Sequence, residues 1–262
     1  MNNYFIAGLI FLNLLTIYYY NKKKIKNLFF KQKITSVDLA EVNEIFLPSK
    51  NTEFKFPKED VVIKFFFINP SFEVVGMTSD YEAWILSCLA KSSKNIFEFG
   101  TCSGKTTALF ALNSSSESKV YSITLDPAGL SNLSLGNNQD GKSALNNAKK
   151  ESIYNQFIFT NMSIKNKINL IFQDSTKLNV DKFENLMDLI FIDGGHNYSC
   201  VKNDSEKSFR MIKNEGYIFW HDYNVSKRSC RDVVKYIHEI SKNKKIFHIK
   251  NTTLCYYKNS NY

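Results

Sequence analysis

Residues 97–107 read FEFGTCSGKTT, and this stretch decides how the rest of the chain is interpreted. The apolar run Ile96–Phe99 ends at Gly100, and a helical pattern starts at Lys105. Gly100 and Gly104 allow the backbone of the turn to approach a ligand closely. Their spacing is neither the Gly-x-Gly-x-x-Gly dinucleotide fingerprint nor that of a phosphate-binding P-loop. The stretch therefore predicts a strand, a turn and a helix, and it leaves both a ligand site and a purely structural turn open.

Strands and helices alternate along the chain on both sides of this turn. A Ser-x-x-Glu capping box, Ser79–Glu82, starts an earlier helix. The alternation predicts an α/β fold with a Rossmann-like, doubly wound, mostly parallel seven-stranded sheet that ends in an antiparallel hairpin. The expected strands are Ile96–Phe99, Val120–Leu125, Ile168–Phe172, Met187–Ile192, Tyr217–Trp220 and the hairpin Lys245–Ile249 with Thr252–Tyr257, and the expected helices are Lys105–Leu112, Ser143–Tyr154, Ser199–Ile212 and Cys230–Ile240.

Polar side chains follow the ends of these strands. Asp126, Asp174 and Asp193 each end a strand, and the pair His221-Asp222 ends another. In doubly wound sheets ligands bind beyond the carboxyl ends of the strands, whereas repeated acidic groups inside a core would be costly. Asp126 lies 22 residues beyond Gly104, where a carboxylate can accept both hydroxyls of a ribose. The pattern predicts one cleft for a nucleoside-like ligand.

Five short motifs in this order resemble the class I S-adenosylmethionine (SAM)-dependent methyltransferases over about residues 78–258. Within that class the chain is most similar to the small-molecule O-methyltransferases that carry an Asp-Gly-x-His-x-Tyr signature. The motifs are FEFGTCSGKTT (97–107), ITLD (123–126), FQDST (172–176), FIDGGHNY (191–198) and GYIFWHDY (216–223).

The resemblance implies roles for particular residues. Asp126 would hold the ribose of SAM, and Asp174 with Ser175 would lie beside its adenine. Residues 127–166 match no substrate loop of the family, so the acceptor is not identified. The loop around the methionine half of SAM would consist of Glu98, Gly100, Thr101, Ser103 and Gly104.

Two histidines and two aspartates are the candidates for chemistry. His196 is the expected general base because imidazole titrates near neutral pH, and a structural role for it is the alternative. Asp193, Asp222 and His221 resemble the positions that hold a divalent cation in metal-dependent relatives, and two hard oxygen ligands would suit Mg²⁺. Those relatives have an acidic or amide residue where His221 stands. Without metal, Asp193 would orient the acceptor. Asp204 is expected on a helix surface rather than in the site.

The N-terminal segment predicts a membrane anchor. Tyr4–Tyr20 is an almost uninterrupted apolar and aromatic run that ends in three tyrosines and is followed by lysines. No positive region precedes it, as a cleaved signal peptide would require, so we expect a single-pass helix with the catalytic domain in the cytoplasm. A buried or interfacial helix is the alternative. The expected domains are an anchor with its basic flank (1–33), a linker and N-terminal extension (34–77) and a methyltransferase domain (78–262).

Composition narrows the function classes. The formal net charge is +9, but six lysines and no acidic residue lie in residues 1–33, so the other 229 residues carry only +3. Nucleic acid is therefore not the expected partner. Five scattered cysteines without CxxC spacing fit a reducing compartment. The expected function is methylation of a small hydroxylated acceptor, such as a sugar or glycolipid near the membrane. A nicotinamide-dependent oxidoreductase and a non-catalytic, membrane-tethered nucleoside-binding module remain as alternatives.

Overall fold

The computed structural model describes residue 18 and residues 34–37, 76–128 and 149–260. Two compact units divide the chain, Met1–Ile34 and Thr35–Tyr262, and every element named below belongs to the second. Among the described residues, no helix is long and apolar enough to cross a membrane. Apart from Tyr18, the predicted anchor lies outside the described residues, so it stays a prediction. Most of the predicted 34–77 extension lies outside them as well.

An eight-stranded sheet forms the centre of the second unit, in the order β1-β7-β8-β6-β5-β2-β3-β4. Among the described strands, β8 alone runs antiparallel to its neighbours, so the predicted mostly parallel sheet with a C-terminal hairpin is confirmed. The strands are β1 (Thr35–Val37), β2 (Asn95–Phe99), β3 (Lys119–Thr124), β4 (Ile168–Phe172), β5 (Met187–Ile192), β6 (Ile212–Trp220), β7 (Phe247–Ile249) and β8 (Cys255–Lys258).

The expectation of seven strands was wrong by one, because β1 adds an edge strand. Its residues Thr35–Val37 lie in the segment expected to be a linker, and they pair in parallel with β7. The hydroxyl of Ser36 lies 3.1 Å from His248 Nδ1. This side-chain contact supports the backbone pairing of β1 with β7. Three residues are too few to show the alternation by which strands are recognised, so β1 could not be predicted from its pattern.

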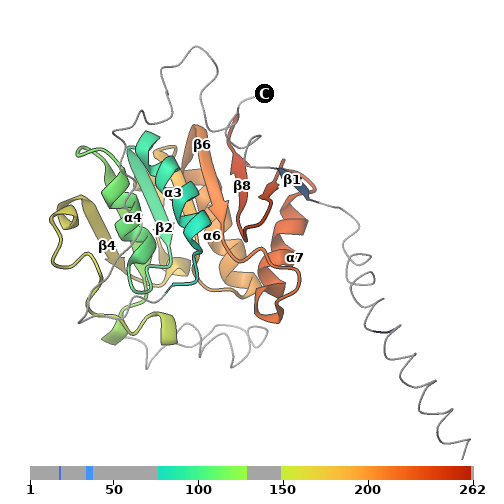
Figure 1. Ribbon diagram of the computed structural model, residues 1–262, viewed down its shortest axis with the longest axis horizontal. Helices are drawn as coiled ribbons and strands as arrows, with labels where there is room; N and C mark the ends of the chain where they lie inside the picture. Colours follow the sequence, from blue (N-terminus) through green and yellow to red (C-terminus); the bar gives the residue numbers. More distant parts are fainter. Residues whose placement is uncertain (1–17, 19–33, 38–75, 129–148, 261–262) are drawn as a thin grey trace, which may run out of the picture. The chain divides into compact units, whose positions relative to one another are not determined.

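Helices cover both faces of the sheet. In Figure 1, α3 (Asp80–Ser92) and α4 (Lys105–Asn113) lie on one face, and α6 (Tyr198–Met211) and α7 (Arg231–Ile240) lie on the other. The predicted capping box is present at the start of α3. Of the helix predicted over 143–154, the described residues 149–151 are helical. Short 3₁₀ turns are η2 (Ser163–Lys167), η3 (Ser175–Lys177), η4 (Asp181–Phe183) and η5 (Arg228–Cys230).

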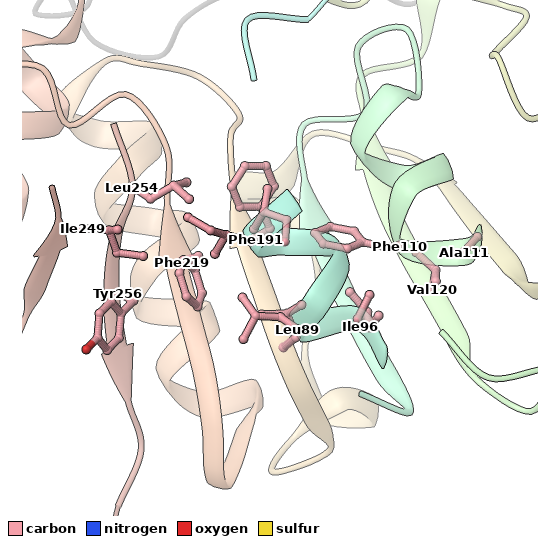
Figure 2. Packing of buried hydrophobic residues seen from close by; sticks show 14 residues of the cluster. Leu89, Ile96, Phe110, Ala111, Val120, Phe191, Phe219, Ile249, Leu254 and Tyr256 are labelled. Atoms are coloured by element: carbon pink, nitrogen blue, oxygen red, sulfur yellow. The ribbon is translucent and has the colours of Figure 1, made fainter. Parts of the chain in front are cut away.

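The core between the sheet and helices α3 and α4 holds the strands in place (Figure 2). Leu89 of α3 and Phe110 of α4 pack there with Phe191 of β5 and Phe219 of β6. The ring of Phe219 stacks on that of Tyr256, with centroids 5.5 Å apart. Burying each such side chain contributes about 1.5–3 kcal/mol, so this packing holds the strand ends firmly.

Register brings the carboxyl ends of the central strands to one edge. Phe99 of β2 is aligned with Ile192 of β5, and Ile192 with Trp220 of β6. The backbone N–H of Asp193 donates to Phe99 O at 2.9 Å, and that of His221 donates to Ile192 O at 3.0 Å. The residues that follow β2, β5 and β6 therefore start side by side, as the sequence predicted.

Candidate active site

Both glycines of the first turn are required by the backbone. Gly100 has φ +99° and Gly104 has φ +85°, a region that side chains disfavour. A Cβ on Gly100 would lie 2.2 Å from the carbonyl oxygen of Asp193, and one on Gly104 would lie 2.6 Å from a ring carbon of Phe159. The glycine at position 100 thus allows the loops after β2 and β5 to touch. The turn leads into α4, whose first N–H groups begin at this edge of the sheet.

Three of the predicted cofactor residues have buried side chains. Glu98 is 1% exposed, and its Oε2 accepts hydrogen bonds from Thr107 and, at 2.6 Å, from Ser122. Thr101 Oγ1 lies 2.7 Å from the hydroxyl of Ser122, and Ser103 is fully buried. Burial raises the pKa of Glu98 to about 8, although the two hydroxyls oppose the shift. These side chains support the turn from beneath, so any contact with a cofactor would come from their backbone.

Asp126 and Asp174 follow β3 and β4 at the same edge. The two strands are aligned up to Thr124 and Phe172, and Asp126 is exposed two residues further on. Its carboxylate accepts the N–H of Ala128 at 2.9 Å. Asp174 caps η3, accepting the N–H and the hydroxyl of Thr176 at 2.9 and 2.8 Å. The predicted ribose and adenine residues are thus placed at the expected strand ends, while their contacts with a cofactor stay predictions.

Asp193, His196 and Asp222 form a cluster in the loops after β5 and β6. Ligand atoms of the three side chains lie within 4.8 Å of one another, a spacing that could hold a metal ion. The cluster opens on a small pocket with a free volume of about 10 Å³, room for roughly one water molecule. The pocket is lined by Ile192, Asp193, Gly194, Gly195, His196, Val201, Trp220, His221, Asp222 and Val233.

His196 and Asp222 form an ion pair. His196 Nε2 lies 2.9 Å from Asp222 Oδ2. Burial lowers the pKa of His196, but the hydrogen bond to Asp222 and the charges of Asp222, Asp193 and Glu151 outweigh it and raise the pKa to about 9. Burial raises the pKa of Asp222, yet the two histidines beside it outweigh this and hold it well below its usual range. At neutral pH the imidazole therefore keeps its proton, and the predicted role as general base would require that proton to be displaced first.

His221 lies behind this cluster. Its Nδ1 is 2.9 Å from Asp193 Oδ1 and 3.4 Å from Asp222 Oδ2, while Nε2 is 3.6 Å from Glu82 Oε2. Among the described residues neither ring nitrogen makes a well-directed hydrogen bond, so these are contacts between charges. Burial lowers the pKa of His221, but the surrounding carboxylates outweigh it and raise the pKa well above its ordinary value. The structure thus adds His196 to the two predicted aspartates, while His221 contacts both aspartates from the side of Glu82, and its predicted role as a metal ligand stays a prediction.

Glu82 is a residue of this site that sequence reasoning missed. It is 2% exposed, and besides facing His221 it accepts the backbone N–H and hydroxyl of Thr253 at 2.6 and 2.8 Å. Its other oxygen accepts the N–H and hydroxyl of Ser79, both at 2.9 Å. Burial raises the pKa of Glu82, but His221, Thr253 and Ser79 outweigh it and lower the pKa to about 2. The capping box predicted only that Glu82 lies at the start of a helix. Nothing in the sequence predicts its contact with Thr253.

Comparison with known proteins identifies the class. Residues 97–223 match the Methyltransf_24 family, described as "Methyltransferase domain". The chain is accordingly a SAM-dependent methyltransferase, as its motifs predicted. A search of curated protein sequences found no significant match.

Solved structures share the fold. A putative caffeoyl-CoA O-methyltransferase from Staphylococcus aureus matches with a TM-score of 0.50 at 15% identity, over 71% of this chain and 86% of its own. An SAH-bound methyltransferase from Podospora anserina matches with a TM-score of 0.50 at 13% identity, over 71% and 80%. At these identities the likeness establishes the methyltransferase fold.

Proposed function

We propose that this protein transfers the methyl group of SAM to a hydroxyl of a small acceptor. The observation that carries the proposal is the convergence of Asp193, His196 and Asp222 within 4.8 Å, at the strand edge of a methyltransferase domain. The fold that the chain shares with a putative O-methyltransferase and with an SAH-bound methyltransferase supports the same reading.

The turn after β2 and the strand ends beside it would hold the cofactor. When bound, SAM supplies a methyl group already activated by its sulfonium. The chain has chiefly to align an acceptor with that methyl, and positioning alone can contribute up to about 7–11 kcal/mol. Gly100 keeps the turn clear of side chains, Asp126 would accept the ribose hydroxyls, and Asp174 would face the adenine.

The small pocket would receive the hydroxyl of the acceptor. Asp193 lies at its rim, half-buried, and can accept the proton that the hydroxyl must lose. His196, held by Asp222 at 2.9 Å, can donate a hydrogen bond to the same oxygen. His221 fixes Asp193 from behind, at 2.9 Å. In this arrangement one side chain removes a proton while its neighbours hold the oxygen in line.

The same three side chains fit a divalent cation. Two carboxylates and one imidazole, with ligand atoms within 4.8 Å of one another, are a common donor set. One imidazole favours a first-row transition metal over the Mg²⁺ suited to an all-oxygen set. When bound, such a cation supplies Lewis acidity that lowers the pKa of a coordinated hydroxyl. Asp193, His196 and Asp222 would hold it, with His196 neutral.

Calorimetry and a turnover screen test the proposal. The protein is titrated with SAM, SAH and NAD, and SAM consumption is then screened against hydroxylated sugars, glycolipids and phenols. We expect SAM and SAH to bind and Asp193→Asn to lower turnover by about 100-fold or more with SAM affinity unchanged. Glu206→Gln, an exposed change on α6, is the control and should match the wild type. Binding of NAD without SAM would overturn the proposal, as would full activity of Asp193→Asn.

We also propose, on the sequence alone, that Tyr4–Tyr20 anchors the protein in a membrane with the catalytic domain in the cytoplasm. Such an anchor would favour acceptors at the membrane, glycolipids among them. Deleting residues 1–33 is expected to move the protein from the membrane to the soluble fraction. Recovery of the shortened protein in the membrane would reject the anchor.

A further inference from the structure

Two charged side chains of α6 face the turn that follows β4, and the proposed chemistry uses neither. They are Asp204 and Lys207, three residues apart and therefore on one face of the helix. Asp204 is 2% exposed, so its expected position on the helix surface was wrong. A carboxylate is rarely buried this deeply without a structural or functional task, because burial of a charge is costly.

Lys207 holds the outer side of the η3 turn. Its Nζ donates to the carbonyl oxygens of Ser175 and, at 2.9 Å, of Thr176. From the other side Asp174 accepts the N–H of Thr176 at 2.9 Å. The turn that carries the predicted adenine residues is thus fixed both by its own cap and by a helix that packs against it.

Asp204 holds the same turn from beneath and also reaches the loop after β5. Asn203 Nδ2 donates to its Oδ1 at 2.8 Å, and Ser175 of the turn lies close enough to the carboxylate to lower its pKa. Its Oδ2 lies 3.3 Å from the place where a Cβ on Gly194 would stand. Burial raises the pKa of Asp204 to about 6, with Ser175, Asn203 and the charge of Lys207 opposing the shift. The carboxylate therefore remains mostly charged at neutral pH.

We infer that Asp204 and Lys207 are positioning residues that set the affinity for the adenosine part of the cofactor. They act through the η3 turn, which follows β4 and carries the predicted adenine residues, and through the backbone at Gly194, which lines the pocket beside Asp193. The inference rests on the proposed use of SAM, and it concerns how that cofactor is held rather than what is methylated.

Titration of the purified protein with SAH tests this role without knowledge of the acceptor. We expect Lys207→Met and Asp204→Asn each to weaken SAH binding at least about tenfold, because each removes bonds made by a charged group. Lys207→Arg keeps a donor for both carbonyls and should stay within about threefold of the wild type. The matched control is Lys202→Met on the same helix, where Lys202 is exposed and lies 3.8 Å from Glu206. It should change SAH affinity less than about twofold.

The outcomes separate the two proposals. If the wild type does not bind SAH, the proposed function fails. If the wild type binds and Lys207→Met binds equally well, the positioning role alone is overturned, even when the melting temperature has fallen. Adenosine provides a second readout, since its affinity should fall by the same factor as that of SAH. If the affinity for SAH falls and that for adenosine does not, the two side chains do not act on the adenosine part of the cofactor, and the inference is wrong. Should Asp204→Asn fail to fold, the two substitutions at Lys207 still decide.

Discussion

Replacing Glu82 by Gln removes one charge from a side chain that joins three distant parts of the chain. The carboxylate accepts bonds from Ser79 at the start of α3 and from Thr253 before β8, and it faces His221 after β6. Glutamine keeps the size of the side chain but not the charge. The substitution therefore isolates what the ionised form contributes to stability and to the site.

The magnitude follows from the pKa. Glu82 has its pKa lowered from 4.5 to about 2, and each pKa unit corresponds to about 1.4 kcal/mol. A carboxyl whose pKa is lowered in the folded state stabilises the protein above the unfolded pKa, and this stability is lost as the pH falls through the folded value. The ionised Glu82 should therefore contribute about 3 kcal/mol at pH 7, roughly half of that near pH 3, and almost nothing below pH 2.

Urea unfolding of the wild type and Glu82→Gln between pH 7 and pH 3 measures this contribution. The difference in unfolding free energy should be about 3 kcal/mol at neutral pH and should shrink as the pH falls below 4.5. Glu206→Gln on α6 is the control, because it removes one exposed carboxylate charge away from this cluster, and its effect on the unfolding free energy should be small at every pH. A difference for Glu82→Gln that is constant with pH would refute the reasoning.

Three further predictions concern the site itself. Gly100→Ala should destabilise the protein by more than about 2 kcal/mol and abolish SAM binding, since its Cβ would lie 2.2 Å from the carbonyl of Asp193; a normal melting temperature would contradict this. The imidazole of His196 should titrate near pH 9 by NMR in metal-free protein, and at least about one unit lower in Asp222→Asn. Because that pKa is raised, the ion pair contributes its full stability below about pH 6.5, and this stability is lost as the pH rises through 9. A His196 pKa close to its ordinary value would show that the ion pair with Asp222 is absent. Chelation of divalent cations should lower turnover more than about tenfold, with Mn²⁺ restoring it better than Mg²⁺, whereas undiminished turnover would show that the three side chains work without metal.

Strands β4 and β5 could be predicted well because each is an apolar run followed within two residues by an aspartate, whereas β6 starts at Ile212, five residues before the predicted Tyr217, because its first half is polar. The predicted bounds of Met187–Ile192 and Ile168–Phe172 are those of β5 and β4 to the residue. The acidic residues that follow these two runs also predicted that Asp193 and Asp174 lie at one edge of the sheet, since parallel strands share the direction in which they end.

Side-chain directions at that edge could not be predicted in the same way. His221 follows its strand directly and lies between the two aspartates and Glu82, whereas His196 sits in a loop and reaches Asp222. How each histidine meets the aspartates depends on loop geometry, which motif spacing does not contain. Glu82 and Thr253 are 171 residues apart, so their bond arises only when α3 packs beside the hairpin.

The short strand β1 has a practical consequence for anyone who shortens this protein. A version that starts at residue 78, where the motifs place the beginning of the domain, would lack Thr35–Val37 and would expose the edge of β7 that faces away from β8. A bare strand edge invites pairing with other molecules, so that version should aggregate more readily than one that begins at or before residue 34.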